Sequence, residues 1–518
     1  MNSRSVRCLE ERLPRPPRLR QAYPVLVRKL AVAGIVSLLL LAGCGGGTSQ
    51  SVNNQPVNNQ PPPPTGGSNA VPTIQALFPS CAPAGEPVQL SLAGLNFVAS
   101  SVVRWNGSDR PTTMDAINGL LAQISASDVA AAGTAAVTVF NPGSGGGSSK
   151  PLTFTITTGA VDPQSIAVDP AGKFAYVASS GCNGGAGGYV SMYTINPTTG
   201  ALASIGPPVP SNDEFTDSVT VDPSGKFAYV ASSGDVWDID FGSISTYTIN
   251  PTTGALTSTA GGINATGING TPEFFNSVAV DPSGKFAYAA DGGAFPAGSF
   301  GGSSNVSMYA ISSTTGALTS IGMVTAGQPV SVAVDPSGKF AYVANENDAP
   351  GPAGNVSMYT INATTGGLTF IGSIAAGIGP DSVAVDPAGR FAYVTNFGSN
   401  DISTYSIDAT TGALTFIGSI AAGTHPFSVA LDPAGKFAYV ANWTGSATDG
   451  SVSMYTIDAM TGSLTPSGTI ATELSPTSIA IHPSGKFAYV TNSGSNSVSM
   501  YSIDSATGTL TLMGTIGT

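Results

Sequence analysis

From residue 160 onward, hydrophobic and polar residues alternate in short runs that end at Gly, Pro, Asn or Asp. One repeating unit reads Ser-Val-Ala-Val-Asp-Pro-x-Gly-Lys-Phe-Ala-Tyr-Val-Ala-Asn, continues with Val-Ser-Met-Tyr-Thr-Ile and ends with Thr-Gly-Ala-Leu-Thr. Each unit holds four runs with the length and composition of β-strands, here called strands A to D. No sustained helical periodicity interrupts them, so a helical bundle is excluded. The pattern predicts an all-β protein.

The unit occurs seven times. The residue that follows strand A marks each copy: it is Asp169, Asp222, Asp281, Asp335, Asp386, Asp432 or His482. Four strands in a repeat of about fifty residues are typical of a β-propeller blade. We therefore predict a seven-bladed β-propeller over residues 159–518. Each blade should take its four strands from one repeat, because the first copy begins at strand A and the last ends at strand D.

Residues 70–158 hold shorter alternating runs between Gly, Pro and Asn turns, which predict a small β-sandwich. Residues 79–85, 94–97, 102–107 and 137–142 resemble, in order, motifs of the immunoglobulin-like IPT/TIG family. That resemblance implies a spacer or interaction module with no chemistry of its own.

The first 43 residues have the layout of a secretory signal. A basic stretch that ends at Lys29 precedes the apolar run 30–41, which is too short for a comfortable membrane span. The following Leu-Ala-Gly-Cys, ending at Cys44, resembles the bacterial lipobox and implies cleavage before Cys44 and a lipid on that residue. Residues 44–69, rich in Gly, Gln and Pro, predict a flexible tether. We expect a lipid-anchored protein of the cell envelope; an uncleaved N-terminal anchor is the alternative.

Charge and cysteine content narrow the partners. The formal net charge is −12, and removal of the basic signal brings it to about −18, which opposes binding to nucleic-acid phosphates. No nucleic-acid partner is expected. Cys81 and Cys182 remain after signal removal and acylation, in a compartment that permits disulfides. They either form one disulfide or stay as separate thiols.

Loop lengths distinguish the two faces of the predicted propeller. The A–B and C–D turns have the same length in all seven repeats, whereas the B–C and D–A loops vary. In an up-and-down blade the B–C and D–A loops emerge on one face, here called the variable face. Loops on a rigid scaffold commonly carry function, so we expect a binding site there.

Polar residues near the start of strand A should line the channel mouth on the variable face. The candidate ligand-binding residues are Asp162, Gln164, Asp217, Asn276, Gln328, Asp381 and His425, with the loop aromatics Trp237, Phe295, Phe397 and Trp443. Aromatic rings beside polar groups suit sugars, peptides or lipids. In the alternative interpretation, these side chains only satisfy strand ends and fix their own loops.

The repeat, above all residues 482–492 and 497–508, resembles the lactonase family of seven-bladed propellers and the wider YVTN surface-repeat propellers. The resemblance implies a channel-face site of His, Glu and Arg in enzymes such as a sugar-phosphate lactonase. In this sequence Arg390 and His482 fall in the constant A–B turn, so no Arg remains for a phosphate. The only catalytic candidate is His425 with Glu473 or Asp381 as the accompanying acid.

Asp235, Asp238 and Asp240 share one B–C loop and are a candidate Ca²⁺ site, although they lack the order of the known calcium loop. No cofactor is expected. The sequence predicts a monomeric propeller that binds an unknown envelope ligand or protein. A lactonase-type hydrolase on the same scaffold is the alternative.

Overall fold

The protein is described by a computed structural model. The described residues are 70–85, 87–114, 119–157, 161–181, 188–211, 215–233, 242–259, 263–264, 274–292, 304–346, 353–444 and 449–518. All regular elements in these ranges are β-strands, as predicted. No helix in the same ranges is long and apolar enough to cross a membrane. The predicted signal peptide at 1–43 and the tether at 44–69 lie outside them.

The first ten strands form two sheets. One has the order β1 (Thr73–Phe78), β3 (Val88–Leu95), β7 (Leu120–Ile124) and β6 (Thr112–Met114). The other has the order β2 (Cys81–Pro83), β10 (Leu152–Thr157), β8 (Gly133–Asn141), β4 (Val102–Trp105) and β5 (Ser108–Asp109), with β9 (Gly147–Ser148) beside β8. Inward residues of both sheets, such as Leu90 and Phe154, share one buried cluster. The IPT/TIG resemblance and the domain limits of this part stay predictions.

The remaining strands form seven sheets, each with four main strands in chain order. The first three sheets are β11 (Pro163–Val168), β12 (Phe174–Ser179), β13 (Tyr189–Ile195) and β14 (Leu202–Ser204); β16 (Phe215–Val221), β17 (Phe227–Ser233), β18 (Ser243–Ile249) and β19 (Leu256–Ser258); and β21 (Phe275–Val280), β22 (Phe286–Asp291), β23 (Asn305–Ile311) and β24 (Leu318–Thr325). Two short strands, β15 (Val209–Pro210) and β20 (Ile263–Asn264), extend the outer edges of the first two sheets.

The other four sheets are β25 (Pro329–Val334), β26 (Phe340–Asn345), β27 (Asn355–Ile361) and β28 (Leu368–Ala375); β29 (Pro380–Val385), β30 (Phe391–Asn396), β31 (Asp401–Ile407) and β32 (Leu414–Ala421); β33 (Pro426–Leu431), β34 (Phe437–Asn442), β35 (Asp449–Ile457) and β36 (Leu464–Leu474); and β37 (Pro476–Ile481), β38 (Phe487–Asn492), β39 (Ser497–Ile503) and β40 (Leu510–Gly517). Each sheet is one blade.

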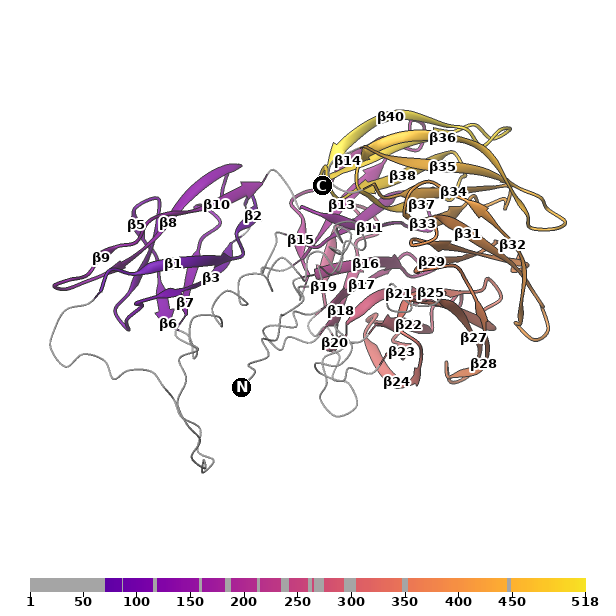
Figure 1. The fold of residues 1–518 in the computed structure, drawn as a ribbon, viewed down its shortest axis with the longest axis horizontal. Coiled ribbons are helices and arrows are strands. Elements are labelled where there is room, and N and C mark those ends of the chain that lie inside the picture. Colours follow the sequence, from indigo (N-terminus) through magenta and orange to yellow (C-terminus); the bar gives the residue numbers. More distant parts are fainter. Residues whose placement is uncertain are drawn as a thin grey trace, which may run out of the picture. The chain divides into compact units, whose positions relative to one another are not determined.

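The innermost strands of the blades form a closed ring. Each strand A contacts the strand A of the next blade, and β11 contacts both β16 and β37. Figure 1 shows these strands gathered at the centre, with later strands of each blade, such as β28, β32 and β40, toward the outside. The seven-bladed propeller predicted from the repeats is therefore the fold of this part of the chain.

Strand B is buried along its whole length in most blades because neighbouring sheets cover both of its faces. Its Tyr side chain crosses to the next blade and donates a hydrogen bond to the carbonyl of the Gly in the C–D turn. Tyr342 reaches Gly412 at 3.0 Å and Tyr176 reaches Gly254 at 3.0 Å. This repeated bond explains why Tyr and Gly occupy fixed positions in every unit.

The ring closes without an exchanged strand, as predicted. The last sheet contains only β37 to β40, and β10 pairs with β2 and β8 instead of joining it. The same Tyr-to-Gly bond joins the last blade to the first, from Tyr489 to Gly200 at 2.9 Å. The imidazole of His482 lies 2.9 Å from the carbonyl of Gly172 at the same junction. Side-chain contacts therefore close the ring.

The marker Asp holds the A–B turn together. In the fourth blade, Oδ1 of Asp335 accepts the backbone N–H groups of Lys339 at 2.8 Å and Phe340 at 2.7 Å. Oδ2 accepts the N–H of Ser337 at 3.0 Å. The predicted structural role of this carboxylate in the turn is confirmed.

We expect Asp335→Ala to lower the free energy of unfolding by about 0.5 to 2 kcal/mol, since several backbone donors lose their acceptor. Denaturant unfolding measures the change. Thr369→Ala, at an exposed position of β28, is the control and should change stability by less than about 0.5 kcal/mol. Equal stability of Asp335→Ala and the wild type would contradict the structural role.

Candidate functional site at the variable face

Strand A carries a bulge in every blade, at the end nearest the variable face. The register of its pairing with strand B shifts across one residue, which is Gln164, Asp217, Asn276, Val330, Asp381, Phe427 or Thr477. A bulge redirects one side chain out of the regular alternation and is common beside functional sites. Four of the residues predicted to line the channel mouth therefore lie at the same bulge position: Gln164, Asp217, Asn276 and Asp381.

The residue two positions before the bulge has an unusual conformation in several blades. Asp162, Gln328 and His425 have positive φ values of 61°, 55° and 49°. A non-glycine residue in this region carries backbone strain, which surrounding contacts must hold in place. A side chain of the preceding blade stabilises this conformation at two of these residues. The backbone N–H of Asp162 donates to the side-chain oxygen of Asn496 at 2.7 Å, and that of His425 donates to the side-chain oxygen of Asn400 at 2.6 Å.

In the first three blades the candidate polar residues bond within the protein. Gln164 donates to the carboxylate of Asp162 at 2.6 Å. The hydroxyl of Ser233 donates to Asp217 at 2.7 Å. Asn276 donates to the carbonyl of Pro329, where the next strand A begins, at 3.1 Å. In the fourth blade, the carbonyl of Gln328 accepts the N–H of Glu346 at 3.0 Å. Many of the polar groups at the channel mouth therefore bond to other groups of the protein. This agrees with the alternative interpretation, in which these side chains only satisfy strand ends and fix their own loops.

An aromatic cluster surrounds His425 between the fifth and sixth blades. The His425 ring stacks on Phe397 with centroids 4.3 Å apart and an interplanar angle of 15°. The Trp443 ring centroid lies 5.8 Å from that of His425, and the backbone N–H of Trp443 donates to the backbone carbonyl of His425 at 2.9 Å. Phe427 meets Phe397 edge to face at 6.2 Å. Phe397 is only 3% exposed, so its ring packs against the imidazole and offers no accessible surface on which a ligand could stack.

His425 retains hydrogen-bonding capacity. Its Nδ1 is buried and has no hydrogen-bond partner. Burial lowers the pKa of the imidazole below its ordinary value, and a backbone hydrogen bond with Trp443 opposes the shift. The neutral form is therefore favoured at neutral pH. A neutral imidazole can accept a proton from water, which is what a general base requires.

Asp381 also has an unsatisfied oxygen at the channel mouth. Its Oδ2 is buried without a hydrogen-bond partner. Burial raises the pKa of its carboxyl well above the ordinary value, and the charge of Glu346 adds to the shift. Asp381 is the bulge residue of strand A in the fifth blade, and Phe427 is the bulge residue of strand A in the sixth. These two inner strands, β29 and β33, are in contact. The structure thus places Asp381 one blade away from His425.

Glu473, the other predicted acid, forms a hydrogen bond at the junction between the sixth and seventh blades. Its Oε2 accepts the hydroxyl of Ser497, on strand C of the seventh blade, at 2.6 Å. No hydrogen bond or ion pair joins Glu473 to His425 among the described residues. Glu473 is thus bonded elsewhere, and the pairing of His425 with an acid stays a prediction.

Protonation of Asp381 should be visible in stability. Between the pKa of an Asp in the unfolded chain, about 3.9, and the raised pKa of Asp381, only the folded state holds the proton. The free energy of unfolding should therefore fall as pH rises across that window. We expect Asp381→Asn to remove this fall, and urea unfolding from pH 4 to 8 measures it. Parallel pH profiles for variant and wild type would contradict the shift.

Positive charge is confined to the opposite face. After residue 158 the Lys and Arg residues are Lys173, Lys226, Lys285, Lys339, Arg390, Lys436 and Lys486, and all lie in A–B turns. Arg390 donates to the carbonyl of Ala459, in the C–D turn of the next blade, at 2.8 Å. The prediction that no Arg of the repeats serves the variable face is thus supported by the fold.

Several predicted residues fall outside the described ranges. These are Trp237, Phe295, the candidate Ca²⁺ ligands Asp235, Asp238 and Asp240, the lipidation residue Cys44, and Cys182. Cys81 is disulfide-bonded, and its partner lies outside the described residues, so the pairing with Cys182 stays a prediction. The described ranges contain no group of three His, Cys, Asp or Glu suited to a metal.

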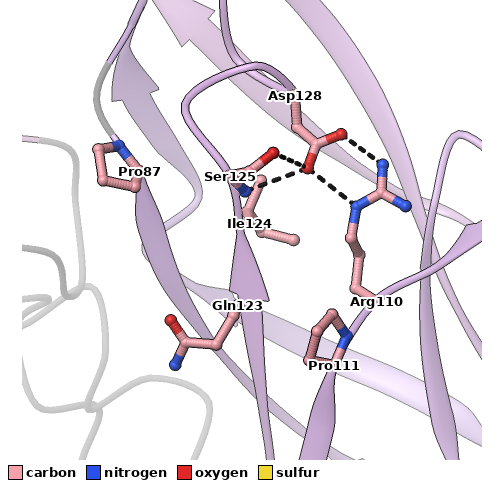
Figure 2. Close-up of a pocket in the computed structure, with 7 residues that line it drawn as sticks. All are labelled: Pro87, Arg110, Pro111, Gln123, Ile124, Ser125 and Asp128. Carbon is pink, nitrogen blue, oxygen red and sulfur yellow. Dashed lines mark hydrogen bonds and ion pairs between the residues drawn. The ribbon is translucent and has the colours of Figure 1, made fainter.

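A pocket occurs beside β7, in the part of the chain before the propeller. It is lined by Pro87, Arg110, Pro111, Gln123, Ile124, Ser125 and Asp128. Figure 2 shows the Arg110 guanidinium facing Asp128, and Nε of Arg110 donates to Oδ2 of Asp128 at 3.0 Å. Arg110 also donates to the carbonyls of Ser108 and Asp109. Since these groups are already paired, the pocket is a structural feature of the fold.

One family model matches the later repeats of the propeller. Residues 265–383, 376–473 and 467–518 match the family described as "Lactonase, 7-bladed beta-propeller". The last part of the propeller is therefore similar to the blades of that family. The matched residues include Asp381, His425 and Trp443, so the candidate site lies in the lactonase-like part of the chain. No curated protein matches the sequence.

Solved structures show the same fold. Two crystal structures, each described as a "putative 6-phosphogluconolactonase", are similar to the propeller. The protein from Bacteroides uniformis ATCC 8492 has a TM-score of 0.54 and 18% identity, over 65% of this chain and 94% of its own. The protein from Bacteroides fragilis NCTC 9343 has a TM-score of 0.51 and 19% identity, over 63% of this chain and 90% of its own. At this identity the similarity concerns the fold alone.

Sequence reasoning missed Glu346, Asn400 and Asn496. Glu346 affects Asp381 from the neighbouring blade. Asn400 and Asn496 hold strained residues of the following blade. The two Asn residues carried a signal: both follow Gly-Ser in the shortest B–C loops, those of blades five and seven. No feature of the sequence distinguishes Glu346 from the other acidic residues of the loops.

Proposed function

We propose that the protein is a lactone hydrolase whose site lies at the variable face, around His425 and Asp381. The match of residues 265–518 to the lactonase family carries this proposal. Two features support it: His425 and Asp381 lie at or just before the start of strand A in neighbouring blades, and each has one buried polar atom without a hydrogen-bond partner. Their pKa shifts favour a neutral imidazole and a protonated carboxyl, which is the pairing of base and acid that ester hydrolysis uses.

In the proposed reaction, His425 takes a proton from a water molecule while the water oxygen attacks the lactone carbonyl carbon. The protonated Asp381 donates a hydrogen bond to the carbonyl oxygen as it gains negative charge. The bond between the carbonyl carbon and the ring oxygen then breaks. The imidazolium returns its proton to the leaving ring oxygen, and the product is a hydroxy acid. No cofactor enters this scheme.

The experiment is hydrolysis of a panel of sugar and aliphatic lactones by the purified protein, followed against the rate in buffer. We expect at least one lactone to open faster with protein than without it. Hydrolysis at the buffer rate across the panel would overturn the proposal.

Non-catalytic binding is the second candidate, and the ring cluster of His425, Phe397 and Trp443 favours it. In that case the protein binds an envelope ligand or protein on the same face without turnover. Binding with no hydrolysis would identify this function. Under either function we propose export and a lipid anchor at Cys44, which mass spectrometry of the protein from membranes would test.

A further inference from the structure

The basic residues of the repeats are confined to one face of the propeller, whereas acidic residues lie on both faces. All seven basic residues of the repeats lie in A–B turns. The described acids on B–C and D–A segments or at the strand ends beside them are Asp162, Asp217, Asp291, Glu346, Asp381, Asp401, Asp449 and Glu473. The sequence has no other Lys or Arg after residue 158. The variable-face loops of the repeats therefore contain no Lys or Arg that could reach the site.

This distribution determines which substrates the site can hold. A phosphate or carboxylate group on a substrate is normally held by Arg or Lys, often through paired hydrogen bonds. At this mouth it would meet carboxylates such as Asp162 and Asp217 and no basic partner from the repeats. In a concave site, charges of one sign repel like-charged ligands over about 8 to 10 Å at moderate salt.

A neutral polyhydroxylated ring suits the same groups. A carboxylate can accept several hydrogen bonds, so Asp162 and Asp217 can accept from ligand hydroxyls in addition to the Gln164 amide and the Ser233 hydroxyl. Trp443 and His425, which lie together in the sixth blade, offer ring surfaces on the same face. None of these contacts requires a charge on the ligand.

We infer that the site takes an uncharged sugar-like lactone and discriminates against the phosphorylated counterpart. This inference rests on the proposed hydrolase function and narrows its substrate class. The two structural neighbours from Bacteroides are described, by contrast, by the name of a phosphorylated lactone.

The test uses two substrates that differ only in the phosphate, glucono-δ-lactone and 6-phosphoglucono-δ-lactone. We expect kcat/KM for the uncharged lactone to exceed that for the phosphorylated one by at least about tenfold at low ionic strength. The ratio should fall as salt screens the repulsion. Faster or equal hydrolysis of the phosphorylated lactone would overturn the inference and leave the hydrolase function standing. Hydrolysis of neither would overturn the proposed function and this inference with it.

A charge variant tests whether the preference for the uncharged lactone depends on the carboxylates of the variable face. Asp217→Asn removes one negative charge at the channel mouth and keeps an oxygen for the Ser233 hydroxyl, so the ratio should fall by about twofold or more. The matched control is Ala409→Lys, which changes net charge by the same amount at an exposed C–D turn on the opposite face. It should leave the ratio unchanged. An equal effect of both variants would show that net charge, not the variable face, sets the preference.

Discussion

We expect His425→Gln to lower kcat/KM for the best lactone by at least about a hundredfold. Removing a general base commonly costs a factor of about 10² to 10⁴, and the Gln amide cannot take a proton from water. Gln keeps much of the size of the side chain that rests on Phe397. Steady-state kinetics with thermal unfolding of the same samples separate lost chemistry from lost folding.

The matched control for this variant is Ser475→Ala. Ser475 occupies the same position before strand A in the seventh blade and has the same unusual backbone, with φ 54°. It carries no imidazole, so its replacement should leave kcat/KM within about twofold of the wild type. Retention of full activity in His425→Gln would remove His425 from the mechanism.

The pH dependence gives a second readout of the same site. Activity should rise as pH increases through the pKa of His425, which burial places below the ordinary imidazole value, because only the neutral ring accepts a proton. It should fall again where Asp381 loses its proton, above the ordinary carboxyl range. Asp381→Asn should abolish the second limb. A high-pH limb that persists in this variant would assign it to another group.

The largest stability effect is expected at the Gly of the C–D turn. Gly412 has φ 74°, and a Cβ built there would lie 2.2 Å from the ring of Phe340 in the preceding blade. Its carbonyl also accepts the Tyr342 hydroxyl at 3.0 Å. Since the left-handed backbone and the close ring both oppose a side chain, we expect Gly412→Ala to lower the free energy of unfolding by about 2 to 5 kcal/mol.

Gly418→Ala is the control for that variant. Gly418 lies in the same blade, on β32, and a Cβ there meets nothing within 4 Å. Its replacement should change stability by less than about 0.5 kcal/mol. Chemical denaturation of the two variants side by side measures the difference. Similar stability of both would show that the contact between blades at Gly412 relaxes without cost.

Much of the architecture follows from the sequence because its determinants are local. The A–B turn, marked by Asp335 in the fourth blade, and the C–D turn with its Gly each have the same length in every repeat, whereas the B–C and D–A loops vary. Short antiparallel pairings depend on neighbours within about fifty residues, so periodicity alone gives seven blades and the position of the variable face. Even ring closure within single repeats follows from where the first copy begins and the last one ends.

The candidate site depended on the tertiary structure, because its contacts join different repeats. Asp381 meets the charge of Glu346 from the preceding blade, and His425 stacks on Phe397 from another. Glu473, an equal candidate by sequence, bonds to Ser497 of the next blade instead. The sequence determined which residue types stand at the channel mouth. Only the packing of adjacent blades decided which of them are buried, which are satisfied, and which keep a group free for chemistry.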